Sequence, residues 1–274
     1  MNKIWLVSLA AVFLSCQPKE ETTTIWRHQK TLQLDSINPI GIAEANGNLW
    51  LSDGDHNRLV KIAPDGKILK TIDSLDRPMH IAVIDSTLFV PEYGKDAISI
   101  FGHKGRSQLL LNDSLDAPAG VSVYGSERAI ADFYNNRILY TGGGDGGWIS
   151  FGKEGKAEGE FYYPTDVQIT QDKIWVADAY NNRVQVFDKK GKFLQMMGQD
   201  QKMNAATGIH VTEKEVFVTD FENDRVLVFD RQGNLKQEIS EDIAKPTDIL
   251  VMDDTLYVLN YRRGSISTFH RTKK

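Results

Sequence analysis

Acidic residues recur at the end of short apolar segments, and most are followed five positions later by an arginine. The acid, or its amide equivalent, stands at six positions, and we call these residues the anchors: Asp53, Glu92, Asp132, Asp178, Asp220 and Asn260. The arginine is present in four of these units: Arg58, Arg137, Arg183 and Arg225. A catalytic group usually occurs once in a chain rather than in every unit. We therefore interpret the pairs as a structural brace, in which the acid caps a turn and pairs with the arginine.

Two of the units lack the arginine. Ala97 and Ser265 stand in its place, after Glu92 and Asn260. Without a partner to hold them, Glu92 and Asn260 are the two anchors that we expect to be free to contact a ligand.

Aromatic residues follow the anchors directly, although turn residues are usually polar. They are Tyr93, Phe133, Tyr134, Tyr180, Phe221 and Tyr261. Exposed aromatic clusters often mark binding surfaces. If the repeated units surround an axis, these rings gather on one face, with Arg262 beside them. This predicts a surface for a protein, a peptide or a glycan. The alternative is that the rings pack between the units and complete the core.

Two histidines and two acids are the candidates for a metal site. His80 and His210 lie on the first segments of the second and fifth units. When the units are aligned, Asp166 and Asp248 fall at the same position, or column, as His80. A metal site needs three or four ligands at about 2.0–2.2 Å from the ion. His210 lies two residues beyond that column, which is about 6.6 Å along a strand. Ordinary polar packing is the alternative, and no cofactor is expected.

Two other motifs carry no chemistry. The glycine-rich segment 141–148 lacks the Gly-Lys-Ser/Thr ending of a phosphate loop and is predicted to be a hairpin turn. No Gly-x-Ser-x-Gly motif is present, and the single cysteine is Cys16.

The elements that must position these residues are short strands. Residues 163–194 contain four segments rich in β-branched and aromatic side chains, separated by turn residues, which predicts a four-stranded antiparallel meander. The anchors repeat every 39 to 46 residues. A second column keeps the same spacing: Pro39, Pro78, Pro118, Pro164, Ala206 and Pro246.

The unit resembles the NHL repeat. The resemblance is carried by Asp178 and by the run Asn182-Arg183-Val184-x-Val186-Phe187-Asp188, and it extends over about residues 24–270. It implies an all-β, six-bladed β-propeller of four-stranded antiparallel blades. The last unit has no fourth strand of its own after residues 265–269. We therefore expect residues 24–34 to supply the outermost strand of blade six and close the ring.

The N-terminus resembles a bacterial lipoprotein signal. Residues 1–15 are a basic start and an apolar run that is too short to span a bilayer. Cys16 follows at the position of the lipidated cysteine, residues 16–23 are expected to be a flexible tether, and the propeller occupies residues 24–274. The segment 17–21 resembles the tether of surface-exported lipoproteins in Bacteroidetes-like bacteria. We predict an extracytoplasmic protein anchored by the lipid on Cys16, at the periplasmic or cell-surface face of the outer membrane.

Composition limits the partners. The chain has 274 residues, 25% of them charged, and a formal net charge of −5, which argues against a nucleic-acid partner. The sequence favours a monomeric binding or scaffold protein without a cofactor. Six-bladed relatives include metal-dependent lactonases and the peptide-amidating lyase, so the resemblance also implies an alternative function, a metal-dependent lyase or hydrolase acting in the central channel.

Overall fold

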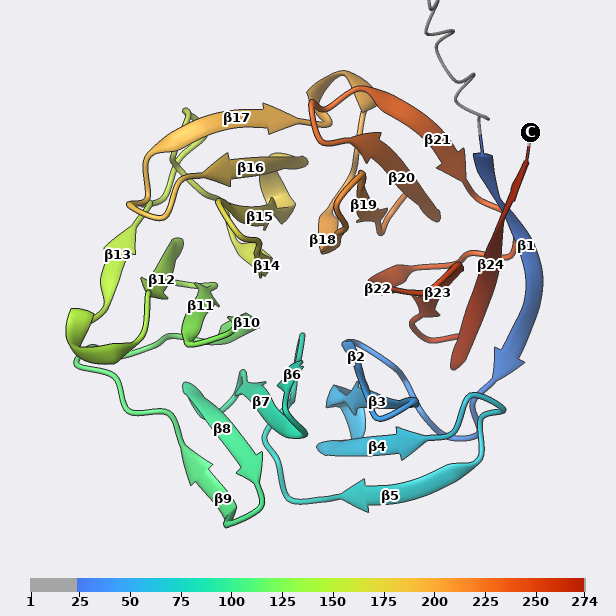
Figure 1. The fold of residues 1–274 in the computed structure, drawn as a ribbon, viewed down its shortest axis with the longest axis horizontal. Helices are drawn as coiled ribbons and strands as arrows, with labels where there is room; N and C mark the ends of the chain where they lie inside the picture. The colour runs from blue at the N-terminus through green and yellow to red at the C-terminus, as the bar shows by residue number, and fades with distance from the viewer. Residues whose placement is uncertain (1–23, 274) are drawn as a thin grey trace, which may run out of the picture.

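Six four-stranded antiparallel sheets form a closed ring in the computed structural model, which describes residues 24–273 (Figure 1). The predicted fold class and the predicted number of blades are both confirmed. Each blade is a meander whose first strand faces the centre of the ring and whose fourth strand lies at the rim. Within the described residues, no helix is both long enough and apolar enough to cross a membrane.

The first three blades follow the chain order. Blade one contains β2 (Ile42–Ala45), β3 (Asn48–Asp53), β4 (Arg58–Ile62) and β5 (Ile68–Ile72). Blade two contains β6 (Ala82–Ile84), β7 (Thr87–Glu92), β8 (Ala97–Gly102) and β9 (Gly105–Gln108). Blade three contains β10 (Pro118–Tyr124), β11 (Glu127–Asp132), β12 (Arg137–Thr141) and β13 (Ile149–Phe151).

The last three blades complete the ring. Blade four contains β14 (Pro164–Ile169), β15 (Ile174–Asp178), β16 (Arg183–Phe187) and β17 (Phe193–Met197). Blade five contains β18 (Ala206–Val211), β19 (Glu215–Asp220), β20 (Arg225–Asp230) and β21 (Leu235–Ile239). Blade six contains β22 (Pro246–Met252), β23 (Thr255–Asn260), β24 (Ser265–Lys273) and β1 (Thr24–Gln33). Four single turns of 3₁₀ helix lie between strands: η1 (Gly54–His56), η2 (Gly144–Gly146), η3 (Ala179–Asn181) and η4 (Gln199–Gln201).

The N-terminal strand closes the ring, as predicted. β1 pairs antiparallel with β24, from Thr24 opposite Lys273 to Gln33 opposite Ser265. β24 continues to Lys273, beyond the predicted end at residue 269, because β1 offers it a pairing partner along its whole length. The two ends of the described chain therefore lie in one sheet (Figure 1).

The core lies between neighbouring blades, because both faces of each sheet are apolar. On β15, Trp175 and Ala177 belong to a buried cluster shared with blade five. Ile174 and Val176, on the opposite face of the same strand, belong to a cluster shared with blade three. Alternation along one strand thus buries side chains on two sides, which a ring of blades achieves for every sheet.

At one end of the ring, a polar clamp joins neighbouring blades at five of the six junctions. Asn182 adopts left-handed backbone geometry (φ 57°) after η3, and its side-chain oxygen accepts a hydrogen bond from the backbone N–H of Ala205 at 2.8 Å. The same contact recurs at four more junctions, between Asn57 and Arg77, Asp96 and Ala117, Asn136 and Tyr163, and Asp224 and Lys245. Asparagine and aspartate tolerate this backbone region better than most residues. The clamps fix the turns that carry the predicted aromatic surface.

Candidate functional site

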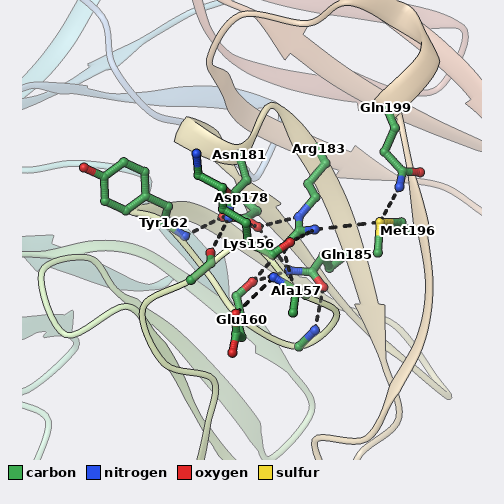
Figure 2. A network of polar contacts seen from close by, with 12 residues as sticks. Lys156, Ala157, Glu160, Tyr162, Asp178, Asn181, Arg183, Gln185, Met196 and Gln199 are labelled. Atoms are coloured by element: carbon green, nitrogen blue, oxygen red, sulfur yellow. Dashed lines mark hydrogen bonds and ion pairs between the residues drawn. The ribbon is translucent and has the colours of Figure 1, made fainter.

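The anchor acid of blade four lies at the centre of a buried hydrogen-bond network (Figure 2). Asp178 is fully buried and accepts hydrogen bonds from the Arg183 Nε at 2.8 Å and from the backbone N–H of Tyr162 at 2.8 Å. The side chains of Asn181 and Gln185 donate to the same carboxylate. Burial outweighs these donors and raises the pKa of Asp178 above its ordinary value. The network ties the hairpin of β15 and β16 to the segment that enters the blade.

The same pairing occurs in the other three units that carry the arginine. The Nε of Arg58, Arg137 and Arg225 lies 2.8, 2.7 and 2.7 Å from the carboxylates of Asp53, Asp132 and Asp220. All three acids are fully buried. These residues are engaged with one another and position the turns, so they are not available to a ligand.

The two anchors without the expected arginine are not free, which corrects the prediction. Glu92 is 1% exposed, and its carboxylate pairs with Arg106, which reaches it from β9 at 2.5 Å. Asn260 is fully buried and bonds to the backbone of Ala244 and to the hydroxyl of Ser267. An arginine on another strand, or a hydroxyl, satisfies the buried polar group where the repeat lacks its own arginine, because an unpaired group there would be costly.

Aromatic side chains form a continuous arc over blades two to four. We call this surface the aromatic arc, and it consists of Tyr93, Phe133, Tyr134, Tyr162, Tyr163 and Tyr180. Ring centroids along the arc lie 4.5 to 5.8 Å apart, and the pairs include stacked and edge-to-face geometries. The arc lies at the end of the ring where the inner strands begin, next to the anchor turns.

Two of the six predicted aromatic residues lie apart from the others in the structure. Tyr93, Phe133, Tyr134 and Tyr180 do gather on one face, but Phe221 and Tyr261 form a separate pair, with centroids 6.4 Å apart. The rings therefore make an arc rather than a complete circle: the series of ring contacts runs from Tyr93 to Tyr180 and does not extend to Phe221. Arg262 lies beside the separate pair, 5.5 Å from the Tyr261 ring.

Tyr162 and Tyr163 were missed by the sequence reasoning, although a signal was present. They precede Pro164, at the start of the inner strand, where no other blade has an aromatic residue and where, for example, blades three and six have Ala117 and Lys245. Because the start of β14 pairs with the end of β15, these two tyrosines come close to the anchor turn and to Tyr180. A register comparison across the six units would have placed them on the arc.

The arc is accessible and has a cation at its edge. Tyr134 is 49% exposed and Tyr180 is 58% exposed. The guanidinium of Arg77 lies 4.8 Å from the centroid of the Tyr93 ring, a cation–π contact. Burial and the neighbouring Tyr134 hydroxyl raise the pKa of Tyr93, so its hydroxyl stays protonated at neutral pH. The surface thus offers flat rings, neutral hydroxyls and one positive group.

A second cluster lies on the axis of the ring. His80, Asp166 and Asp248 come from the inner segments of blades two, four and six, and each offers a ligand atom within 4.8 Å of the others. We call these residues the channel triad. The His80 Nδ1 lies 3.4 Å from the Asp248 Oδ2 and 3.9 Å from the Asp166 Oδ2. All three side chains are buried.

Glycines in the alternate blades allow this convergence. The column of the triad reads Gly41, His80, Gly120, Asp166, Gly208 and Asp248. A Cβ on Gly120 would lie 2.8 Å from the Thr165 carbonyl oxygen, and one on Gly41 would lie 2.6 Å from the Met79 carbonyl oxygen. Neighbouring inner strands therefore approach too closely for a side chain. The alternation of glycine with ionisable residues was the sequence signal for three-fold convergence.

His210 does not join the triad, which corrects its place among the metal candidates. It lies two residues past the glycine of its column, on β18, and its ring lies 6.5 Å from that of Phe217. Two residues correspond to about 6.6 Å along a strand, which is too far for a shared ion. Burial lowers the pKa of His210 to about 4, so it is neutral at neutral pH.

A cavity of about 350 Å³ extends from the triad along the channel. Its lining consists of the triad and of residues further along the inner strands, including Glu44, Tyr124, Gln168 and His210. No lining residue precedes the triad on its strand, so the triad forms the end of the cavity nearest the aromatic arc. The volume suits a small molecule.

The charges of the triad are coupled. Burial alone would lower the pKa of His80, but the carboxylates of Asp166 and Asp248 outweigh it and raise that pKa to about 9. Burial raises the pKa of Asp166 to about 7, opposed by the nearby imidazole. A proton on His80 thus compensates the buried negative charge when nothing else does.

Comparisons with known proteins agree with the fold and the repeat. The family model of the NHL repeat matches residues 161–187. Protein lin-41 of Caenorhabditis elegans is 47% identical over 47 residues, which are 17% of this chain and 4% of that protein. The chain therefore matches only a small part of that relative.

Two solved structures share the architecture over nearly the whole chain. Virginiamycin B lyase from Staphylococcus aureus has a TM-score of 0.65 at 15% identity and covers 90% of this chain and 99% of its own. A gluconolactonase from Xanthomonas campestris has a TM-score of 0.69 at 12% identity and covers 91% of this chain and 100% of its own. At these identities the likeness concerns the fold alone.

Proposed function

We propose that this six-bladed propeller, which contains an NHL repeat, is a membrane-anchored extracytoplasmic binding protein whose aromatic arc holds a peptide segment, a protein or a glycan. The observation that carries the proposal is the continuity of the arc, in which six rings from three blades contact one another on one accessible face. Aromatic residues contribute most strongly at binding interfaces, where they supply contact area at a small cost in conformational entropy.

The support beneath the arc favours binding by a preorganised surface. Tyr180 lies in η3, next to the network around Asp178, and Tyr163 is held by the clamp from Asn136. A surface whose side chains are already ordered loses less entropy when a ligand binds. The Arg77 guanidinium at the edge adds a donor for a carboxylate or a hydroxyl of the ligand.

Replacing Tyr134 or Tyr180 by alanine is expected to weaken ligand binding by roughly 10- to 100-fold, because each truncation removes an exposed ring from the arc. Ligands would first be found by screening the purified protein on glycan and peptide arrays, and affinities would then be measured by calorimetry. Circular dichroism would show that the variants fold.

Tyr124 provides the matched control. It is 44% exposed, close to the value for Tyr134, but it lines the channel cavity away from the arc. Tyr124→Ala should leave binding unchanged. If Tyr124→Ala weakens binding while Tyr134→Ala does not, the ligand occupies the channel, and the alternative of a lyase or hydrolase acting there replaces the arc.

Attachment to the membrane through a lipid on Cys16 is the second part of the proposal. Cys16 and the predicted signal and tether lie outside the described residues, and β1 begins at Thr24. Eight residues from 16 to 23 would reach at most about 29 Å when fully extended, so the lipid would hold the propeller close to the membrane.

Changing Cys16 to serine is expected to move the protein from the membrane fraction to the soluble extracytoplasmic fraction, because serine removes the only thiol. Fractionation of cells and metabolic labelling with an alkyne fatty acid would measure this. A wild-type protein that takes up no fatty acid would contradict the anchor and leave the binding proposal to its own test.

A further inference from the structure

We infer that the channel triad, His80, Asp166 and Asp248, is a binding site for one divalent transition-metal ion, of which Zn²⁺ fits best, with an open coordination position toward the channel cavity. The inference does not rest on the binding function of the aromatic arc, which lies outside the cavity. The residues and the readouts that test the two proposals are different.

The spacing of the ligand atoms matches a small ion. A tetrahedral ion with bonds of about 2.0–2.2 Å separates its ligand atoms by about 3.4 Å. The two distances from the His80 Nδ1 to the carboxylate oxygens are 3.4 and 3.9 Å. The third separation is no more than 4.8 Å. Small side-chain movements would therefore suffice to bring all three atoms into the coordination shell.

An unpartnered imidazole nitrogen points independently to a ligand. His80 is 4% exposed, and its Nδ1 is one of two buried side-chain atoms without a hydrogen-bond partner among the described residues. A buried polar atom without a partner is costly and needs an explanation. Its nearest polar neighbours are the two carboxylates of the triad, so an ion between them would give the nitrogen its missing contact.

The carboxylates are held in place and retain free lone pairs. Asp166 accepts hydrogen bonds from the backbone N–H groups of Val167 and Ile209 at 2.8 and 2.9 Å. Asp248 accepts them from Ile249 and Ile42 at the same distances. Each carboxylate has about four acceptor positions, so capacity remains for an ion. Backbone donors that orient carboxylates in this way are typical of the outer shell of metal sites.

His80 differs from the two acids in how its backbone is used. Its N–H donates to the Ala119 carbonyl and its carbonyl accepts from Val121, so at this level of the channel the backbone of His80, and not its imidazole, joins blades two and three. At the equivalent junctions of blades four with five and six with one, an aspartate side chain accepts the corresponding N–H. The imidazole is therefore not needed to hold the ring together, which frees it for an ion.

The ligand set and the cavity determine what the ion could do. One imidazole and two carboxylates suit Zn²⁺ or Mn²⁺ better than an ion that prefers thiolates. Three protein ligands leave a fourth position, and the lining of the cavity begins at the triad. A carboxylate, phosphate or carbonyl oxygen of a small molecule of suitable size for about 350 Å³ could occupy that position.

The test uses the purified full-length protein in detergent, stripped with a chelator and dialysed. Titration with ZnCl₂ is followed by calorimetry, thermal unfolding and elemental analysis. We expect about one ion per chain and a rise in Tm, because an ion that binds only the folded state stabilises it. Co²⁺ in place of Zn²⁺ should produce visible absorption bands of a four-coordinate nitrogen and oxygen site.

Variants make the result specific to the triad. His80→Gln should weaken Zn²⁺ binding by roughly 100-fold or more and abolish the Co²⁺ bands. His210→Gln is the matched control, since His210 also lines the cavity but lies outside the triad, and it should bind as the wild type does. If His80→Gln does not fold, Asp248→Asn takes its place.

Three outcomes would overturn the inference. They are no saturable binding by the wild-type protein, binding that survives both triad variants, and binding of Ca²⁺ or Mg²⁺ alone. The second outcome would assign the ion to surface groups such as the exposed His103. None of these results would affect ligand binding by the aromatic arc, which Tyr134→Ala tests separately.

Discussion

Replacing Asp178 by alanine is expected to lower the free energy of unfolding by about 3–5 kcal/mol. The substitution removes an acceptor that four groups share, the Arg183 guanidinium, the side chains of Asn181 and Gln185, and the backbone N–H of Tyr162. Arg183 is 6% exposed, so its charge would remain buried without a carboxylate partner. Urea unfolding followed by fluorescence and circular dichroism measures the change.

The matched control is the exposed acid of a similar ion pair. Asp113 lies 2.6 Å from Arg137, but its side chain is 52% exposed. Asp113→Ala should cost less than about 1 kcal/mol, because water replaces the carboxylate and exposed pairs contribute little. Equal losses in the two variants would contradict the interpretation of the anchor acids as a buried brace. Because Tyr180 lies in the 3₁₀ turn that follows Asp178, the substitution Asp178→Ala should also displace Tyr180 and weaken ligand binding at the arc.

The metal-free protein is expected to lose roughly 3 kcal/mol of unfolding free energy as the pH rises from 6.5 to 9. The pKa of His80 is raised from 6.5 to about 9 in the fold, so between these values the folded protein holds a proton that the unfolded chain releases. Stability therefore falls with increasing pH in this window. Below pH 6.5 both states are protonated at His80, and its contribution is fully present.

Other groups of the channel titrate at lower pH. The pKa of Asp166 is raised to about 7, so its contribution to stability is lost as the pH rises from about 4 to 7. The pKa of His210 is lowered to about 4, so its contribution is lost as the pH falls from 6.5 to 4. These two effects on the unfolding free energy oppose each other at acidic pH. Above pH 7, of these three groups only His80 changes the unfolding free energy with pH.

Urea unfolding at a series of pH values, with a chelator present, would measure the slope, and an NMR titration would follow the imidazole of His80 directly. His210→Gln should leave the slope above pH 7 unchanged, because that histidine is already neutral there. A flat or rising curve between pH 7 and 9, or a His80 imidazole that titrates near 6.5, would contradict the prediction.

Local patterns were sufficient to predict the architecture. Alternation of apolar side chains on segments such as 174–177 specifies two buried faces, and two columns with a common spacing specify six equivalent units. The missing fourth strand of the last unit specified that residues 24–34 must complete it, and β1 does so. These properties depend on neighbours in sequence or on the repeat, so one chain is enough to infer them.

The partners of individual side chains were predicted less well. Glu92 was expected to be free because Ala97 replaces the arginine of its unit, yet Arg106 reaches it from the next strand. The spacing of the repeat relates only the anchor and the residue five positions later, which lie on one hairpin. It does not predict a contact from Arg106, which lies on the fourth strand of the blade, β9. The same reasoning missed Tyr162 and Tyr163, whose contacts with Tyr180 depend on how strands pair within the blade.

The sequence by itself determined the blades, their number, the strand that closes the ring and the identity of the anchor pairs, because repetition and alternation are properties of the chain. The tertiary structure alone decided that the aromatic rings form an arc rather than a circle and that His80 meets Asp166 and Asp248 instead of His210. The contacts of the triad join residues more than 80 positions apart, and the curvature of the ring and the close approach of inner strands at Gly41 and Gly120 bring them together.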